Sequence, residues 1–89
     1  MNLGEFIEIF ENDEIEDDLS NVVGCNALEG LNIIKKYMPT QGIGGASHDV
    51  IYSVLVTDLV EQGITISDAL RLKKLNWMIE GGEYMACFV

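Results

Sequence analysis

Apolar residues recur every three or four positions in three stretches of the chain, which is the spacing of one face of an α-helix. The first stretch runs from Leu3 to about Asn12, the second from Ala27 to Met38, and the third from Ile66 to Leu75. We therefore expect three amphipathic helices. The second carries so many apolar residues that we expect it to be covered on more than one side and to form the centre of the core.

Local signals mark the ends of the second and third helices. Asn26 is a good N-cap, and Glu29 three residues later completes the pattern of a capping box. Pro39 lacks a backbone N–H and should end this helix. Thr65 is the expected N-cap of the third helix, with Asp68 at its third position.

One glycine interrupts the second helix. Gly30 costs up to ~1 kcal/mol relative to alanine in a helix interior. It is either a place where another element approaches closely or a residue that the helix simply tolerates.

The remaining apolar stretches have β character. Asp49 to Val56 is rich in β-branched residues on both faces, which favours a central strand. A helix running on to Gln62 is the alternative, because apolar residues here also fit helical spacing. Trp77–Ile79 and Tyr84–Phe88 flank Gly81-Gly82, a pair suited to a hairpin turn.

These elements predict a single α+β domain spanning residues 1–89. Two main helices should pack on a small antiparallel sheet of about three strands, with the acidic N-terminal helix across the outside. Thr40 to Ser47 is expected to be a flexible loop, and Leu19 to Cys25 a helical turn that Gly24 ends. The apolar C-terminal stretch should be buried in the sheet or covered by a partner.

Charge changes this picture at one end of the chain. The sequence has 15 acids, five bases and a net charge of −10, and eight of the acids with none of the bases lie in the first 18 residues. These eight are Glu5, Glu8, Glu11, Asp13, Glu14, Glu16, Asp17 and Asp18. They form either a solvated face with an acidic loop, or a row of carboxylates presented to a basic groove of a partner protein.

Catalytic and cofactor chemistry is sparse. Cys25, His48 and Asp49 are the residue types of a nucleophile, a base and an orienting group, but their order in the chain decides nothing. One histidine and two cysteines without a C-x-x-C pair make a poor zinc set. Gly42 to Gly45 lacks the Lys and Ser/Thr of a phosphate-binding loop. We expect no enzymatic activity, no metal and no cofactor.

The chain carries no apolar run near the ~18 residues of a membrane span, and no signal-peptide pattern at its start. We therefore expect a cytoplasmic protein with two reduced thiols. Direct binding to nucleic acid is not expected, because the net charge of −10 would repel phosphate.

Interaction with another protein is the function class that this composition favours. Our first hypothesis is a non-enzymatic inhibitor whose acidic face occupies the nucleic-acid site of a nuclease or other nucleic-acid-binding protein. Small, acidic proteins of this kind are typical of phages and mobile elements, where they act against CRISPR effectors and other host defences. The alternative is a structural or regulatory adaptor that binds a protein partner, or a second copy of itself, through its apolar C-terminal sheet. In that case the acidity serves solubility.

Overall fold

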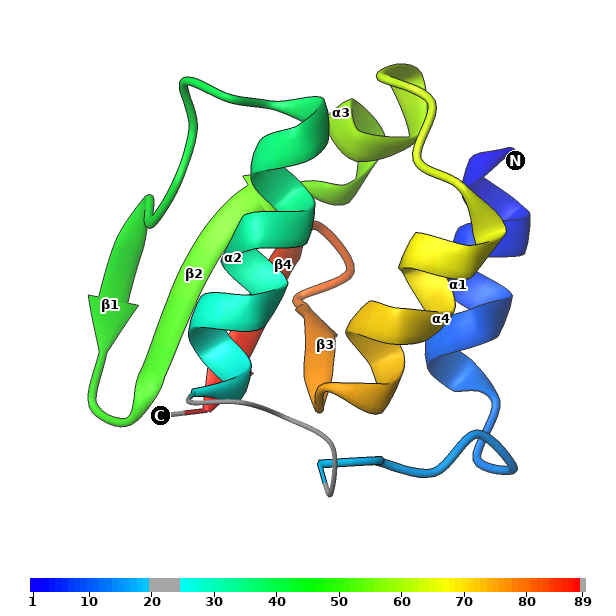
Figure 1. The fold of residues 1–89 in the computed structure, drawn as a ribbon, viewed down its shortest axis with the longest axis horizontal. Helices are drawn as coiled ribbons and strands as arrows, with labels where there is room; N and C mark the ends of the chain where they lie inside the picture. The colour runs from blue at the N-terminus through cyan, green and yellow to red at the C-terminus, as the bar shows by residue number, and fades with distance from the viewer. Residues whose placement is uncertain (20–24, 89) are drawn as a thin grey trace.

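The computed structural model describes residues 1–19 and 25–88. This part of the chain forms a layer of helices against a four-stranded sheet (Figure 1), which confirms the α+β class. The helices are α1 (Leu3–Glu11), α2 (Asn26–Tyr37), α3 (Val56–Glu61) and α4 (Ile66–Lys74). The strands are β1 (Gly45–Ser47), β2 (Val50–Leu55), β3 (Trp77–Glu80) and β4 (Tyr84–Phe88). The turn expected between Leu19 and Cys25 lies largely outside the described residues.

The sheet has the order β1-β2-β4-β3, with every neighbouring pair antiparallel. As predicted, β2 is a central strand, and a helix follows it directly. The alternative of one continuous helix from His48 to Gln62 is wrong. The expected three strands are four, because Gly45–Ser47 pairs with β2 where we predicted a loop. Its three residues are small and exposed, so they show no apolar pattern that could have indicated a strand.

The start of α2 corrects the predicted cap. Cys25 is the N-cap and makes no side-chain capping bond, and Asn26 is the first helical residue. The Asn26 side-chain amide instead donates to the Leu75 carbonyl at 2.8 Å and contacts Cys87 Sγ at 3.5 Å. The Asn26 side chain therefore makes tertiary contacts instead of the capping box with Glu29 that we predicted. The other end is as predicted, because α2 stops at Tyr37, shortly before the proline.

Gly30 marks a close approach between α2 and β3. A Cβ atom built on Gly30 would lie 1.9 Å from Nε1 of Trp77. The same Nε1 donates a hydrogen bond to the Asn26 carbonyl at 3.2 Å. Glycine is required here because the indole occupies the space that any larger residue would need.

The core lies between the sheet and the helices. On α2 only one face is buried, through Ala27, Gly30 and Ile34, whereas Leu28 is 58% exposed. The expectation that α2 is covered on several sides is therefore wrong, and it is an outer helix packed on the sheet. The fully buried large side chains come from the four helices, the residues next to α3 and α4, and β4: Phe6, Ile34, Leu59, Ile64, Leu72, Leu75, Met85, Val56 and Cys87.

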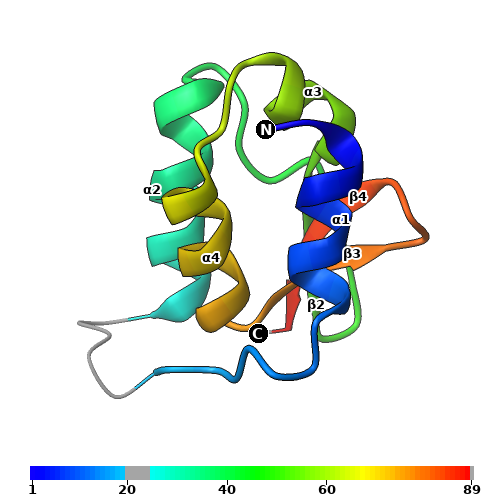
Figure 2. The same ribbon diagram turned by 90° about the vertical axis from the view of Figure 1, so that its right-hand side faces the viewer.

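α1 closes one end of this core. We expected it to lie across the outside, but Phe6 is fully buried and Leu3, Ile9 and Phe10 pack against the core. Figure 2 shows α1 beside the sheet, next to β3. At the C-terminal end Met85, Ala86 and Cys87 are fully buried within β4, as expected, while Phe88 is 55% exposed.

The ends of α2 and α4 are joined by a cluster of polar side chains. Thr65 caps α4 as predicted, accepting from the Asp68 backbone N–H at 3.1 Å. The Asp68 carboxylate accepts from Lys36 Nζ at 2.8 Å and from the Tyr37 hydroxyl. Burial of Asp68 acts to raise its pKa, but the hydrogen bonds from Lys36 and Tyr37 outweigh it and hold the pKa below the usual value.

Replacing Gly30 with alanine should destabilise the protein although alanine is the better helix former. The added methyl group would collide with Trp77, and overpacking of this kind costs ~1–3 kcal/mol. Urea unfolding measures the loss. The control is Gly45→Ala, whose Cβ meets nothing within 4 Å and should change stability by less than ~0.5 kcal/mol. Equal stability of wild type and Gly30→Ala would contradict the described contact.

Asp68→Asn should make the free energy of unfolding change less with pH in the acidic range. Because the pKa of Asp68 is lower in the folded state, its charge stabilises the fold above the unfolded pKa of ~3.9, and this contribution disappears as the pH falls through the folded value. The stability difference between wild type and variant should therefore be present at neutral pH and shrink as the pH falls below about 5 and through the lowered pKa of Asp68. Urea unfolding at several pH values measures it. The same change at exposed Asp13 controls for net charge, and a difference that stays constant with pH would rule out this role.

Candidate functional site

The eight N-terminal acids lie on one continuous stretch of chain, and every one of them is exposed. We call residues 5–18 the acidic segment. Glu5, Glu8 and Glu11 project from α1, and the other five follow in an irregular stretch. The Asn12 side chain accepts from the Glu14 N–H at 3.0 Å, and the Asp18 N–H donates to the Lys74 carbonyl at 2.8 Å. The stretch after α1 is thus fastened near both of its ends.

The three glutamates of α1 do not form a straight row. At ~100° per residue, the direction of the side chain turns by ~60° from each glutamate to the next. Glu5 and Glu8 border a hollow of about 280 Å³ that also touches Ile9 and Ile66. Glu11 borders a different hollow, on the side of α1 that faces β3. The carboxylates therefore form a band that crosses the outer side of the helix.

Glu5 has a structural role that our functional reading of the sequence missed. Its carboxylate accepts from the Asn2 backbone N–H at 2.9 Å, while the Asn2 side chain accepts from the Glu5 N–H at 2.8 Å. This is a capping box at the start of α1. The spacing of Asn2 and Glu5 was the signal that could have revealed it.

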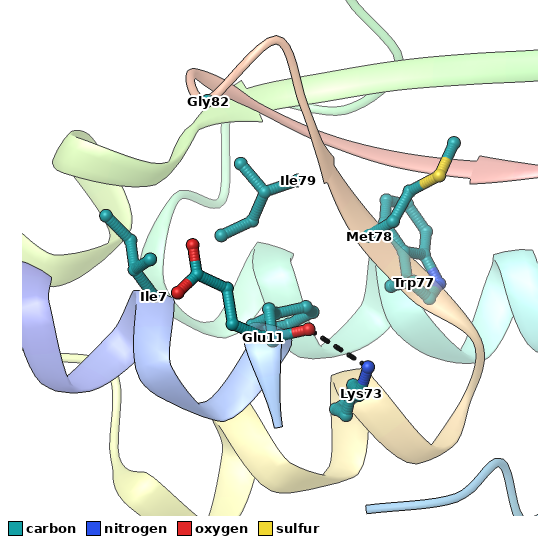
Figure 3. Close-up of a pocket in the computed structure, with 8 residues that line it drawn as sticks. Ile7, Glu11, Lys73, Trp77, Met78, Ile79 and Gly82 are labelled. Atoms are coloured by element: carbon teal, nitrogen blue, oxygen red, sulfur yellow. Dashed lines mark hydrogen bonds between the residues drawn. The ribbon is translucent and has the colours of Figure 1, made fainter. Parts of the chain in front are cut away.

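The hollow beside Glu11 has a volume of about 380 Å³ and lies between α1 and β3 (Figure 3). Its apolar lining includes Ile7, Phe10 and Ile79. Lys73 Nζ donates to the Phe10 carbonyl at 3.0 Å, the bond drawn in Figure 3. Lys73 lines the hollow as well as Glu11, so its apolar interior is bordered by one positive and one negative charge and could accept an apolar side chain. The sequence did not predict this hollow, because its walls come from distant parts of the chain.

The basic residues lie on α2 and α4. Two ion pairs described in the structure join α4 to α2. They are Lys36–Asp68 at 2.8 Å and Arg71–Glu29 at 3.7 Å. Neither of these two pairs involves a residue of the acidic segment.

The residues weighed for catalysis occupy exposed positions. Cys25 precedes α2, and His48 and Asp49 form the turn between β1 and β2. No hydrogen bond among the described residues joins these three side chains. Cys87 is buried, and burial raises the pKa of its thiol, with the nearby Cys25 acting in the same direction. A thiol with a raised pKa is a poor nucleophile.

Within residues 1–19 and 25–88, no group of three or more His, Cys, Asp or Glu side chains is arranged to hold a metal ion. None of the helices described there has the length and apolar character needed to cross a membrane.

Comparison with known proteins gives no relative, because no protein-family model, curated protein or solved structure matches the chain.

Replacing Glu5 and Glu8 separately by alanine should distinguish an exposed carboxylate that caps α1 from one that does not. Glu5→Ala removes half of the capping box and should cost about 0.5–1 kcal/mol of stability. Glu8→Ala, one turn further along the same helix, should cost less than ~0.5 kcal/mol. Chemical denaturation measures both, and an equal effect of the two changes would contradict the cap.

Proposed function

We propose that this protein binds a basic, nucleic-acid-binding surface of another protein through its acidic segment, and thereby inhibits that protein. The observation that supports the proposal most is the exposure of all eight acids of residues 5–18 on one stretch of chain. A nuclease or another nucleic-acid-binding protein of a host defence system is the kind of target that this chemistry suits.

The spacing of the charges supports this proposal. Glu5, Glu8 and Glu11 are three residues apart, so each step rises ~4.5 Å along the helix axis. Phosphates follow one another at ~3.4 Å along one strand of a DNA duplex. A protein surface that binds a row of phosphates therefore meets a comparable density of negative charge on α1. Long-range attraction would also speed the encounter.

The hollow beside Glu11 adds a possible anchor. Charged contacts at the rim of an interface mainly guide association, while apolar groups buried near its centre supply most of the affinity. An apolar side chain of the partner entering the hollow beside Ile7 and Ile79 would supply such a contact. Guidance by Glu11 and anchoring in the hollow that it borders would then act next to each other.

Two quadruple variants with the same net charge test the proposal. The first replaces Glu8, Glu11, Glu14 and Glu16 with glutamine and keeps Glu5 because of its cap. The control replaces exposed Glu61, Glu80 and Glu83 with glutamine and Asp49 with asparagine. Each protein is immobilised and exposed to a bacterial lysate at about 50 mM and about 500 mM salt, which spans strong and weak screening.

Wild type and the control should capture the same nucleic-acid-binding protein at low salt, and duplex DNA should displace it. The acidic-segment variant should bind that protein at least tenfold more weakly, a loss of about 1.4 kcal/mol. Equal weakening of binding by both variants would mean that net charge alone, and not the position of the acids, determines binding. Capture that survives high salt and DNA would contradict the proposal.

A further inference from the structure

The hollow beside Glu5 and Glu8 follows α1 on the side that meets the start of α4. It has a volume of about 280 Å³, which is room for one long side chain, and its apolar walls are Met1, Ile9, Ile15 and Ile66. Figure 1 shows the start of α4 beside α1, and the two helices are in contact. Ile66 is the first residue of α4 and is 54% exposed, so this wall is open to a side chain from outside.

Two carboxylates border these apolar walls, and none of the side chains that line the hollow is basic. Glu5 and Glu8 are three residues apart on α1, so their Cβ atoms are ~5–6 Å from each other. One oxygen of Glu5 accepts from the Asn2 backbone N–H at 2.9 Å, which holds this carboxylate in position. The two ion pairs between described residues involve neither these glutamates nor the Met1 amino group. The hollow therefore combines apolar walls with a negative rim.

This combination is complementary to a side chain that has an apolar stem and a positive end. Lysine and arginine are such side chains, because their stems lie along apolar surface while the charged group stays at the edge. Arginine suits two neighbouring carboxylates better, since its planar guanidinium has five donors in a fixed fork, whereas the lysine ammonium is a compact, strongly hydrated charge. The hollow beside Glu11 lacks this pattern, because Lys73 lines it.

We propose that the hollow beside Glu5 and Glu8 binds an arginine side chain of the partner protein. The stem lies against Ile9 and Ile66, and the guanidinium lies between the two carboxylates. This inference rests on the proposed function, because arginines that contact phosphates are residues that a nucleic-acid-binding surface offers. It adds the chemistry of one contact: the acidic segment attracts any basic surface, whereas the hollow selects arginine.

Titration of the whole chain with the peptide acetyl-Gly-Arg-Gly-amide, followed by nuclear magnetic resonance at about 50 mM salt, tests the proposal. The backbone amide signals of Glu8, Ile9 and Ile66 should shift and saturate. We expect a dissociation constant on the order of 1–10 mM, because exposed ion pairs are weak.

Two further peptides test the chemistry of the side chain. The peptide with lysine in place of arginine should bind about threefold more weakly or less, and the peptide with citrulline, the neutral counterpart of arginine, should give no saturable shifts. Equal binding of the arginine and lysine peptides would overturn the proposal. So would shifts spread evenly over residues 5–18, because they would show attraction to charge without a site.

Two variants test the two parts of the hollow. Glu8→Gln removes one carboxylate, and Ile66→Ser removes an apolar wall without changing the charge. Each should weaken binding of the arginine peptide about threefold or more. The matched controls are Glu80→Gln, at an exposed glutamate of β3, and Leu28→Ser, at a 58% exposed apolar residue of α2, and both should bind as wild type does. Amide signals that keep their wild-type positions elsewhere establish that each variant is folded. Wild-type binding by both hollow variants would contradict the proposal.

The titration needs no partner protein, so its result is separate from that of the lysate experiment. An arginine peptide that does not bind the hollow overturns this inference and leaves capture through the acidic segment unaffected. Failure of capture from the lysate contradicts the proposed function, whereas saturable binding of the arginine peptide would still assign the hollow to this side chain.

Discussion

The contact between Trp77 and the N-terminal half of α2 is the interaction on which the arrangement of the layers depends. The indole fills the space above Gly30 and donates to the Asn26 carbonyl, while the Asn26 side chain donates to the Leu75 carbonyl. These contacts fix the first turns of α2 on the segment that joins α4 to β3. Because each polar atom involved has a partner, the indole can be buried without the cost of an unpaired donor.

This junction also decides which surfaces remain open. Trp77 draws α2 to one side of the sheet, and the polar cluster around Asp68 places α4 beside it on the same side. α1 then packs against α4 and the edge of β3, burying Phe6. With the described helices gathered at one face and one edge, the residues around Tyr84 and Phe88 are left uncovered.

The acidic segment and the basic side chains lie on different elements of the molecule. The acidic segment follows α1 and the irregular chain after it, and the basic side chains lie on α2 and α4. Attraction to a basic protein would therefore weaken as salt screens the acidic segment.

Several features were determined by the sequence itself because they depend on neighbours along the chain. The helical periods, the Thr65 cap, the hairpin turn at Gly81 and Gly82, and the position of the acids are all local properties, and the structure agrees with them. Only the tertiary structure decided the others, because they depend on residues far apart in sequence. The Asn26 side chain donates to the Leu75 carbonyl instead of capping α2. Gly45–Ser47 is a strand because it pairs with β2. One side of the sheet is uncovered because the helices pack on the other. The pattern of one strand cannot show these outcomes, since pairing and coverage are properties of the partner and not of the strand.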